Sequence, residues 1–228
     1  MNKVKLISLS QGAGEFEGKS PEEMIVYCAR VSSPRADKFD SPEGLIKYCI
    51  KHGHWSIFEQ ANMVLEINTS RAISAQILRH RSFSYQEFSQ RYAEVPGIEE
   101  IELRMQGKTN RQVGDEVADP ILTKASDVDG SRTPEWKASD EVSNIIEEIQ
   151  ESYGRLLEAG VARESARMIL PMASSSKLYM NGTVRSWIHY INLRTEEDTQ
   201  KEHREIAEMA KSIFIEQFPT ISNALGWK

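Results

Sequence analysis

The sequence is poor in cysteine, has no excess of basic residues and contains no long apolar run. Its two cysteines, Cys28 and Cys49, lie in segments with an apolar helical pattern, which is typical of reduced structural thiols in a cytoplasmic protein. The formal net charge of −6 and the pI of about 5.5 argue against a nucleic-acid partner, which calls for a basic excess. No apolar segment approaches the ~18 residues of a membrane span, so no membrane partner is expected.

The composition is otherwise that of a folded globular protein. The 228 residues suit one domain of generous size, and a hydrophobic fraction of 39% with a charged fraction of 27% does not indicate disorder. The sequence contains no internal repeat and no convincing linker. We therefore predict a single helix-rich α+β domain over residues 1–228.

Local signals along the chain support this fold class. SPEE at 20–23 and SPE at 41–43 each combine a serine cap, a proline at the first helical position and an early acid, which predicts that a helix follows. Helices are predicted over 21–31, 42–52, 71–80, 135–159, 163–170, 183–193 and 199–218, and strands over 4–8, 62–68 and 98–105. Residues 106–134 are polar and contain several glycines and prolines, so we expect a long surface excursion there.

Basic charge is concentrated in one segment of this acidic sequence. Residues 71–91 hold four arginines against a single acid, Glu87, with several serines among them. Guanidinium groups match phosphate oxygens in a two-pronged geometry, so the cluster predicts an anion site. A solvated basic face with salt bridges to the acids at 94–102 explains the same residues equally well. The residues by themselves leave both interpretations open.

Aromatic residues interleave with the basic segment and suggest a different function. Phe83, Tyr85, Phe88 and Tyr92 are spaced as stacking platforms for a single-stranded nucleic acid would be. The acidic total and the lack of a second basic stripe count against that partner.

The histidines raise the question of a metal site. His52 and His54 have H-x-H spacing and His80 follows later, but no cysteine or carboxylate cluster accompanies them. We therefore predict no bound metal.

Four segments together resemble the flavin-dependent thymidylate synthases. In the first, Arg79-His80-Arg81 is followed after seven residues by Ser89 and then Arg91. The others are KHGHWSIFE at 51–59, RESARMILP at 163–171 and RSWIHYINLR at 185–194, the last continued by Gln200 and Glu202. The segments occur in family order, from about Arg30-Val31-Ser32 to the C-terminal helix, which makes coincidence an unsatisfactory explanation.

The resemblance implies a reaction, its cofactors and an assembly. Enzymes of this family methylate dUMP at C5 to give dTMP, in de novo thymidylate biosynthesis. The carbon comes from 5,10-methylenetetrahydrofolate and the hydride from reduced FAD, and NADPH or NADH re-reduces the flavin. They are typically homotetramers with a helical, mixed-sheet or antiparallel-sheet fold and active sites shared between subunits. A catalytically dead relative would keep the phosphate-binding arginines but lack Arg194 or the flavin segment, and both are present.

The resemblance also assigns site residues. The expected flavin contacts are His54, Ser56, Arg79, His80, Arg81, Glu87, Thr183, Arg185 and His189. The expected dUMP contacts are Gln76, Arg79, Glu87, Ser89, Gln90, Arg91, Arg167 and Arg194. The family often has asparagine where this chain has Thr183, so that contact departs from the pattern.

Arg194 is the expected catalytic residue. A fixed cation beside the N3/O4 edge of the pyrimidine would stabilise the charge that develops there, and such preorganised electrostatic help is usually the largest catalytic contribution. The alternative is that Arg194 merely pairs with Glu197 or Asp198 near a helix end. Ser89 lies near His80 in sequence and invites a nucleophile hypothesis. The family pattern favours a mechanism without an enzyme nucleophile, in which Ser89 binds phosphate and both cysteines are core residues.

Overall fold

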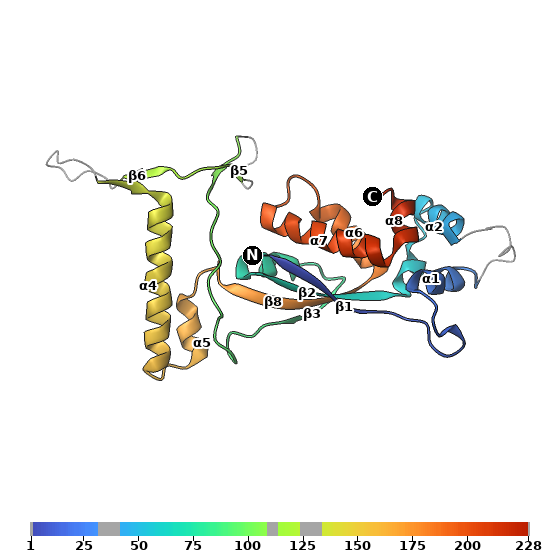
Figure 1. Cartoon of the computed structure of the whole chain (residues 1–228), viewed down its shortest axis with the longest axis horizontal. Coiled ribbons are helices and arrows are strands. Elements are labelled where there is room, and N and C mark those ends of the chain that lie inside the picture. Colours follow the sequence, from blue (N-terminus) through green and yellow to red (C-terminus); the bar gives the residue numbers. More distant parts are fainter. Residues whose placement is uncertain (1, 32–41, 109–113, 124–133, 228) are drawn as a thin grey trace. The chain divides into compact units, whose positions relative to one another are not determined.

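The structure is a computed structural model that describes residues 2–31, 42–108, 114–123 and 134–227 (Figure 1). Its contacts group these residues into two compact units. We call the first the sheet unit (described residues within 2–69, 73–87 and 177–228) and the second the long-helix unit (described residues within 70–72 and 88–176). The prediction of a single domain stays a prediction.

The sheet unit is built on a four-stranded sheet in the order β1-β2-β8-β3. The strands are β1 (Lys3–Leu9), β2 (Asn62–Ser70), β8 (Ser175–Thr183) and β3 (Ser84–Glu87). β1 pairs antiparallel with β2, and β3 pairs antiparallel with β8. This sheet agrees with the predicted α+β class.

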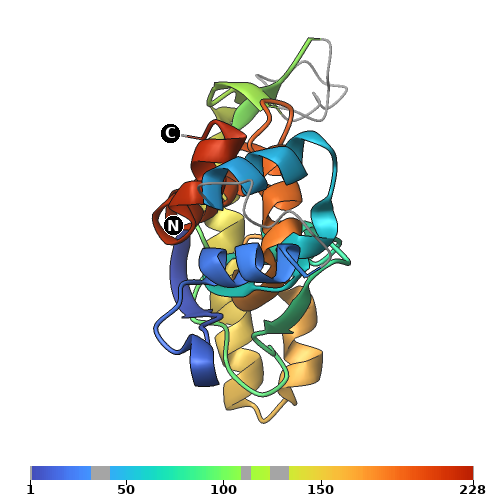
Figure 2. The same ribbon diagram turned by 90° about the vertical axis from the view of Figure 1, so that its right-hand side faces the viewer.

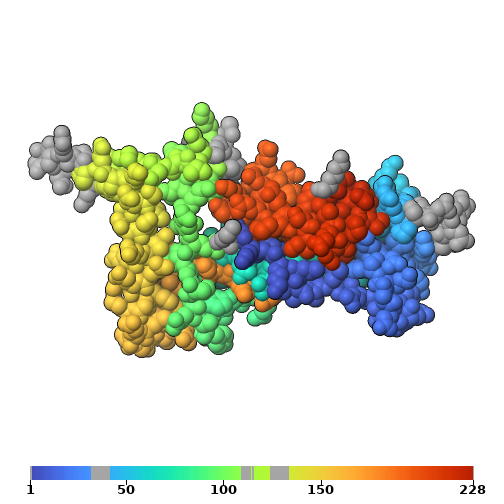
Figure 3. Space-filling model, in the orientation of Figure 1, coloured from blue at the N-terminus to red at the C-terminus, as the bar shows by residue number. Residues whose placement is uncertain are grey.

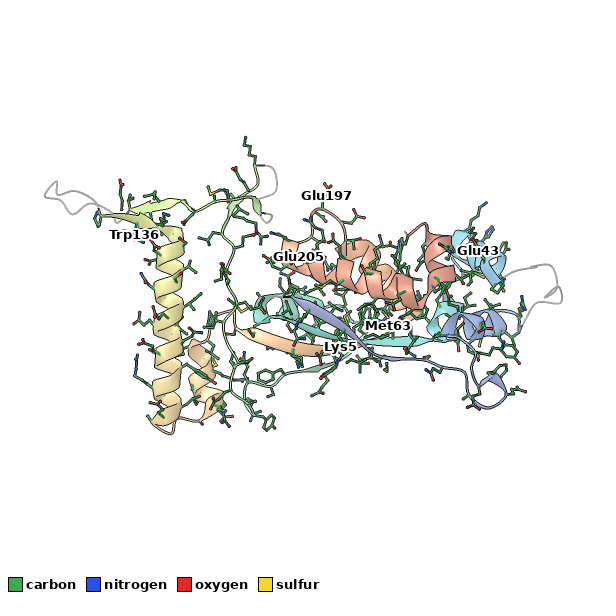
Figure 4. The ribbon with its side chains drawn as sticks, viewed as in Figure 1. Lys5, Glu43, Met63, Trp136, Glu197 and Glu205 are labelled. Atoms are coloured by element: carbon green, nitrogen blue, oxygen red, sulfur yellow. The ribbon has the colours of Figure 1, made fainter. Side chains whose placement is uncertain are left out.

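Alternating burial gives the sheet one buried face. Along β2, Met63, Leu65 and Ile67 are fully buried while the residues between them are partly exposed, which is the pattern of a strand that packs on one side only. The helices α6 (Val184–Arg194), α7 (Lys201–Gln217) and α8 (Pro219–Leu225) lie along this unit (Figures 1 and 3). Figure 4 shows Met63 between sheet and helices, where its backbone carbonyl accepts a hydrogen bond from Trp187 Nε1 at 2.9 Å.

The first two helices complete the core of the sheet unit. Ser20 caps α1 (Pro21–Ala29) as the sequence predicts, and the structure adds a reciprocal capping box with Glu23. α2 (Pro42–Lys51) packs against α8 (Figure 2) and ends before Gly53, whose φ of +69° favours glycine. Short 3₁₀ segments, Gly14–Phe16 and Trp55–Glu59, flank these helices. Ser41 lies outside the described residues, so its predicted cap has no structural counterpart to compare.

The long-helix unit takes its name from α4 (Ala138–Glu158), which is followed by α5 (Arg163–Ala166) and a 3₁₀ turn, Arg167–Ile169. Two small antiparallel pairs precede α4. They are β4 (Arg104–Gln106) with β5 (Gly114–Val117), and β6 (Ile121–Thr123) with β7 (Glu135–Lys137). The described part of the expected surface excursion therefore contains strands, and its segments 109–113 and 124–133 lie outside the description.

Several predicted boundaries were wrong for physical reasons. The helix expected over 71–80 is α3 (Arg71–Ile77), which ends early because the chain turns to begin β3. No continuous strand forms over 98–105. Ile98 makes an isolated β-bridge with Ser174, and β4 begins only at Arg104. β3 and β8 were missed altogether. On the buried face of β8 stand Ser176 and Gly182 as well as Leu178 and Met180, so its apolar alternation is incomplete.

Candidate active site

Arg194 contacts an uncharged partner at the C-terminal end of α6. Its Nε donates a hydrogen bond to His80 Nε2 at 2.9 Å. Burial and the nearby Arg194 charge lower the pKa of His80 to about 4, so this imidazole is neutral at pH 7. Neither Glu197 nor Asp198 pairs with Arg194 among the described residues, and Glu197 points away from the helices in Figure 4. The alternative that Arg194 is a surface ion pair is therefore wrong.

A fully buried histidine that the sequence did not single out lies next to this pair. His203 on α7 faces Tyr190 OH at 3.1 Å through Nε2 and Gln76 Oε1 at 3.2 Å through Nδ1. Gln76 Nε2 in turn donates to Gln200 Oε1 at 2.6 Å. The His80 and His203 rings lie 6.1 Å apart, so the expected ligand contact Gln76 and the Arg194–His80 pair share one polar cluster. The only sequence signal for His203 is a polar residue at an apolar helical position.

Three of the expected flavin contacts line one cavity. His54, Ser56 and Arg185 border a cavity of about 510 Å³. A second cavity of about 870 Å³ shares Ala29, Ser56 and Ile57 with it. The larger cavity is also lined by Arg30, whose buried Nε has no hydrogen-bond partner among the described residues.

Other expected flavin contacts from α6 lie near the same cavity wall. The ring of His189 lies 4.8 Å from that of Trp55, and Trp55 lines the smaller cavity. Burial, helped by the Arg185 charge, lowers the pKa of His189. Arg185 Nη1 pairs with Glu59 Oε1 at 2.5 Å. Thr183 instead caps α6 through a hydrogen bond from Ser186 N at 3.2 Å, so its side chain has a structural task.

The basic segment contributes cations that are not neutralised. Arg79 and Arg81 are exposed, and neither guanidinium forms an ion pair or hydrogen bond with any residue that the structure describes. The competing interpretation, in which this face pairs with the acids at 94–102, does not hold for these two arginines. Glu87, the one acid of the segment, accepts a hydrogen bond from Ser74 Oγ.

The remaining expected dUMP contacts belong to the long-helix unit. Ser89 Oγ accepts a hydrogen bond from Arg91 N at 3.3 Å, and the intervening Gln90 completes this turn. The exposed Arg91 side chain pairs with Glu164 on α5 at 3.1 Å. Arg167 follows α5, and its buried Nε has no hydrogen-bond partner within the described chain. The second unit therefore holds the four remaining residues that the sequence predicts to contact dUMP.

The two cysteines lie in different environments. Cys49 is buried, and burial raises the pKa of its thiol, which disfavours a nucleophilic thiolate. Cys28 is half-buried and lines the larger cavity, so it is not the core residue that the sequence predicts. Within the described residues, no three or more His, Cys, Asp or Glu side chains are grouped to hold a metal ion.

Comparison with known proteins identifies the family. The family model described as "Thymidylate synthase complementing protein" matches residues 16–220. The flavin-dependent thymidylate synthase of Synechocystis sp. is 46% identical over 226 residues, which cover 98% of this chain and 99% of that protein. A probable flavin-dependent thymidylate synthase of Paramecium bursaria Chlorella virus 1 is 45% identical over 227 residues, again covering 98% and 99%.

A solved structure agrees with the same assignment. The crystal structure of the UMP/dUMP methylase PolB from Streptomyces cacaoi, bound with 5-Br dUMP, superposes with a TM-score of 0.73 at 25% identity. It covers 99% of this chain and 95% of that one.

The chain belongs to the flavin-dependent thymidylate synthases, a family of methyltransferases, as its four motifs predict. The single-stranded nucleic-acid hypothesis finds no support in these relatives. No helix within the described ranges is long and apolar enough to cross a bilayer.

Proposed function

We propose that this chain methylates dUMP at C5 to dTMP, with 5,10-methylenetetrahydrofolate as carbon donor and reduced FAD as hydride donor. NADPH or NADH would re-reduce the flavin. One carbon and two electrons reach the pyrimidine in total, and the folate leaves as tetrahydrofolate. The observation that carries the proposal is the Arg194 cation, which bonds to the neutral His80 in a polar cluster that includes Gln76.

The residues present fit a flavin dinucleotide. Such a ligand needs a long site with cationic or N–H donors for its two phosphates and flat surfaces for its rings. The two adjoining cavities supply the length, and Arg185 and the unpartnered Arg30 Nε supply donors. We propose that His54, Ser56, Arg79, His80, Arg81, Glu87, Thr183, Arg185 and His189 hold this cofactor, with Thr183 acting through the helix end that it caps. When bound, the flavin supplies the hydride.

Arg194 would act on the charge that develops in the pyrimidine. Nucleophilic attack by C5 requires electron density to build up along the N3/O4 edge and then to return. Because its partner His80 is neutral, the Arg194 charge is not compensated, and its remaining N–H groups are available for that edge. Had Arg194 paired with a carboxylate, much of this stabilisation would be lost.

The phosphate of dUMP would be bound by the donors of the long-helix unit. Ser89, Gln90, Arg91 and Arg167 offer hydroxyl, amide and guanidinium groups, and Arg91 would exchange the Glu164 carboxylate for phosphate. Gln76 and Glu87 would contact the nucleoside. No step in this scheme needs a cysteine nucleophile, in keeping with the raised pKa of Cys49.

We further propose a cytoplasmic homotetramer with active sites shared between subunits. The long-helix unit exposes large apolar side chains, notably Met168 (78% exposed), Val117 (62%) and Met172 (58%), which suits burial against another copy.

The test is formation of dTMP by the purified protein from dUMP, 5,10-methylenetetrahydrofolate and NADPH. The protein should be yellow and should release FAD on denaturation. Flavin-loaded protein that binds dUMP but forms no dTMP under reducing conditions would overturn the proposal. Arg194→Ala, which should retain flavin, is the matched negative control.

A further inference from the structure

A directed chain of hydrogen bonds runs from the buried Tyr190 and His203 outward to the exposed Gln200. Gln76 Nε2 donates to Gln200 Oε1, which leaves Gln76 Oε1 as the atom that faces His203 Nδ1. An amide oxygen only accepts, so Nδ1 must carry the proton. His203 Nε2 is then the acceptor, and the buried Tyr190 hydroxyl donates to it.

His203 is therefore a neutral imidazole in one tautomer. Its side chain is fully buried, and burial together with the Arg194 charge and then His80 lowers its pKa to about 3. The chain continues outward, since Gln200 Nε2 donates to Glu202 Oε2 at 2.9 Å. Every link, from Tyr190 through His203, Gln76 and Gln200 to Glu202, donates in the same direction.

We propose that His203 is a positioning residue that fixes the side-chain amide of Gln76 in one orientation for the pyrimidine nucleotide. With Oε1 held by His203 and one N–H held by Gln200, Gln76 offers a ligand its remaining N–H and its second lone pair in set directions. The inference rests on the proposed function in that Gln76 contacts dUMP. If the Gln76 side-chain amide could rotate by half a turn, its oxygen and its nitrogen would change places. Held in one orientation, it accepts a hydrogen bond on one side and donates on the other, so it favours a nucleotide edge with the matching donor and acceptor.

Two substitutions separate the two hydrogen bonds of His203. His203→Asn places an amide nitrogen at the same number of bonds from Cα as Nδ1, so it keeps the donor to Gln76 and loses the acceptor for Tyr190. His203→Gln places an amide oxygen at the position of Nε2, so it keeps the acceptor and loses the donor to Gln76. A role limited to filling the core would make the two variants alike.

The measurement is the affinity of the flavin-loaded protein for dUMP, with flavin content and melting temperature recorded for each variant. We expect His203→Gln to weaken dUMP binding about three- to tenfold, as the loss of one neutral hydrogen bond does. His203→Asn should recover most of that loss. Ser212→Ala, an exposed change on the same helix, should bind as the parent does. Equal affinity of the two His203 variants for dUMP would overturn the proposal.

The tautomer gives a second readout that needs no variant. Nitrogen NMR of the parent protein labelled with ¹⁵N-histidine should show His203 protonated at Nδ1 and not at Nε2. A proton on Nε2 would reverse the chain and overturn the proposal, even if the His203 variants do not fold.

Failure of the proposed function has a different signature. A parent that binds dUMP and forms no dTMP contradicts the proposed reaction and leaves the role of His203 standing. A parent that forms dTMP while His203→Gln and His203→Asn bind dUMP equally well contradicts only the role of His203. A parent that does not bind dUMP contradicts both.

Discussion

Arg194 and Arg91 show how the two units use the same side chain differently. In the sheet unit, the half-buried Arg194 bonds to a neutral histidine, so its charge is kept. In the long-helix unit, the exposed Arg91 pairs with the Glu164 carboxylate. A cation without a counter-charge, such as Arg194, suits a site where negative charge develops during a reaction. An exposed ion pair contributes little stability, so Arg91 can exchange its Glu164 carboxylate for an incoming anion.

The largest effect should come from breaking the scaffold that holds Arg194. Trp187→Ala removes a fully buried side chain on α6 and its hydrogen bond to Met63, and we expect a loss of about 3–5 kcal/mol in the free energy of unfolding. Ile145→Ala, an exposed change on α4, should stay within about 0.5 kcal/mol. Urea unfolding of both variants measures this. A loss below about 1 kcal/mol for Trp187→Ala would mean that α6 is not anchored as described.

Removal of the uncompensated cation comes next. Arg194→Ala should lower turnover about 10²–10³-fold, the usual effect of deleting one preorganised charge stabiliser, while the flavin content stays near that of the parent. Steady-state kinetics with flavin quantified by absorbance measures both. Arg155→Ala, on the exposed face of α4, is the matched arginine control. Equal losses of turnover and flavin would assign Arg194 a structural role.

Acid should weaken the sheet unit through its buried histidines. All five histidines of the chain belong to that unit. The native pKa values of about 4 for His80 and about 3 for His203 lie below the unfolded value of 6.5, so the unfolded state binds protons first as the pH falls. Stability is full above pH 6.5 and declines as the pH drops toward 4, by at most about 1.4 kcal/mol per pH unit for each group. Urea unfolding at pH 7.5 and 5 measures the decline.

His203→Gln is the control for this acid effect, because glutamine cannot take up the proton. Its unfolding free energy should fall less steeply between pH 7.5 and 5 than that of the parent. Identical declines would show that His203 does not contribute.

The smallest effects concern the exposed ion pair of the long-helix unit. Arg91→Ala should weaken dUMP binding roughly tenfold, because it deletes a charged donor to phosphate. Glu164→Gln should change that affinity less than about threefold, since an exposed ion pair contributes little. Titration with dUMP at two salt concentrations measures both changes. Unchanged affinity in Arg91→Ala would refute its role at the phosphate.

Local signals in the sequence predicted much of the fold. The serine cap at Ser20, the stop at Gly53 and the helix at α6 follow from residues within a few positions of one another. β8 could not be predicted this way. Its buried face includes Gly182, where an added Cβ would lie 2.3 Å from the Phe83 ring, so a residue remote in sequence dictates the small side chain.

The order of residues along the chain was enough to indicate the class of chemistry. The chain is acidic, has one dense group of arginines and two cysteines without an activating base, and carries four motifs in family order. It belongs to the flavin-dependent thymidylate synthase family. The hydrogen-bond partners of the site residues, in contrast, follow from the fold. Arg194 and His80 are 114 positions apart and His203 and Gln76 are 127 apart, so both contacts depend on α6 and α7 lying against α3 and the residues that follow it. The spacing of apolar residues predicts which face of a helix is buried. The segments that pack against that face, which are remote in sequence, determine how deeply each side chain is buried and which charges lie next to it.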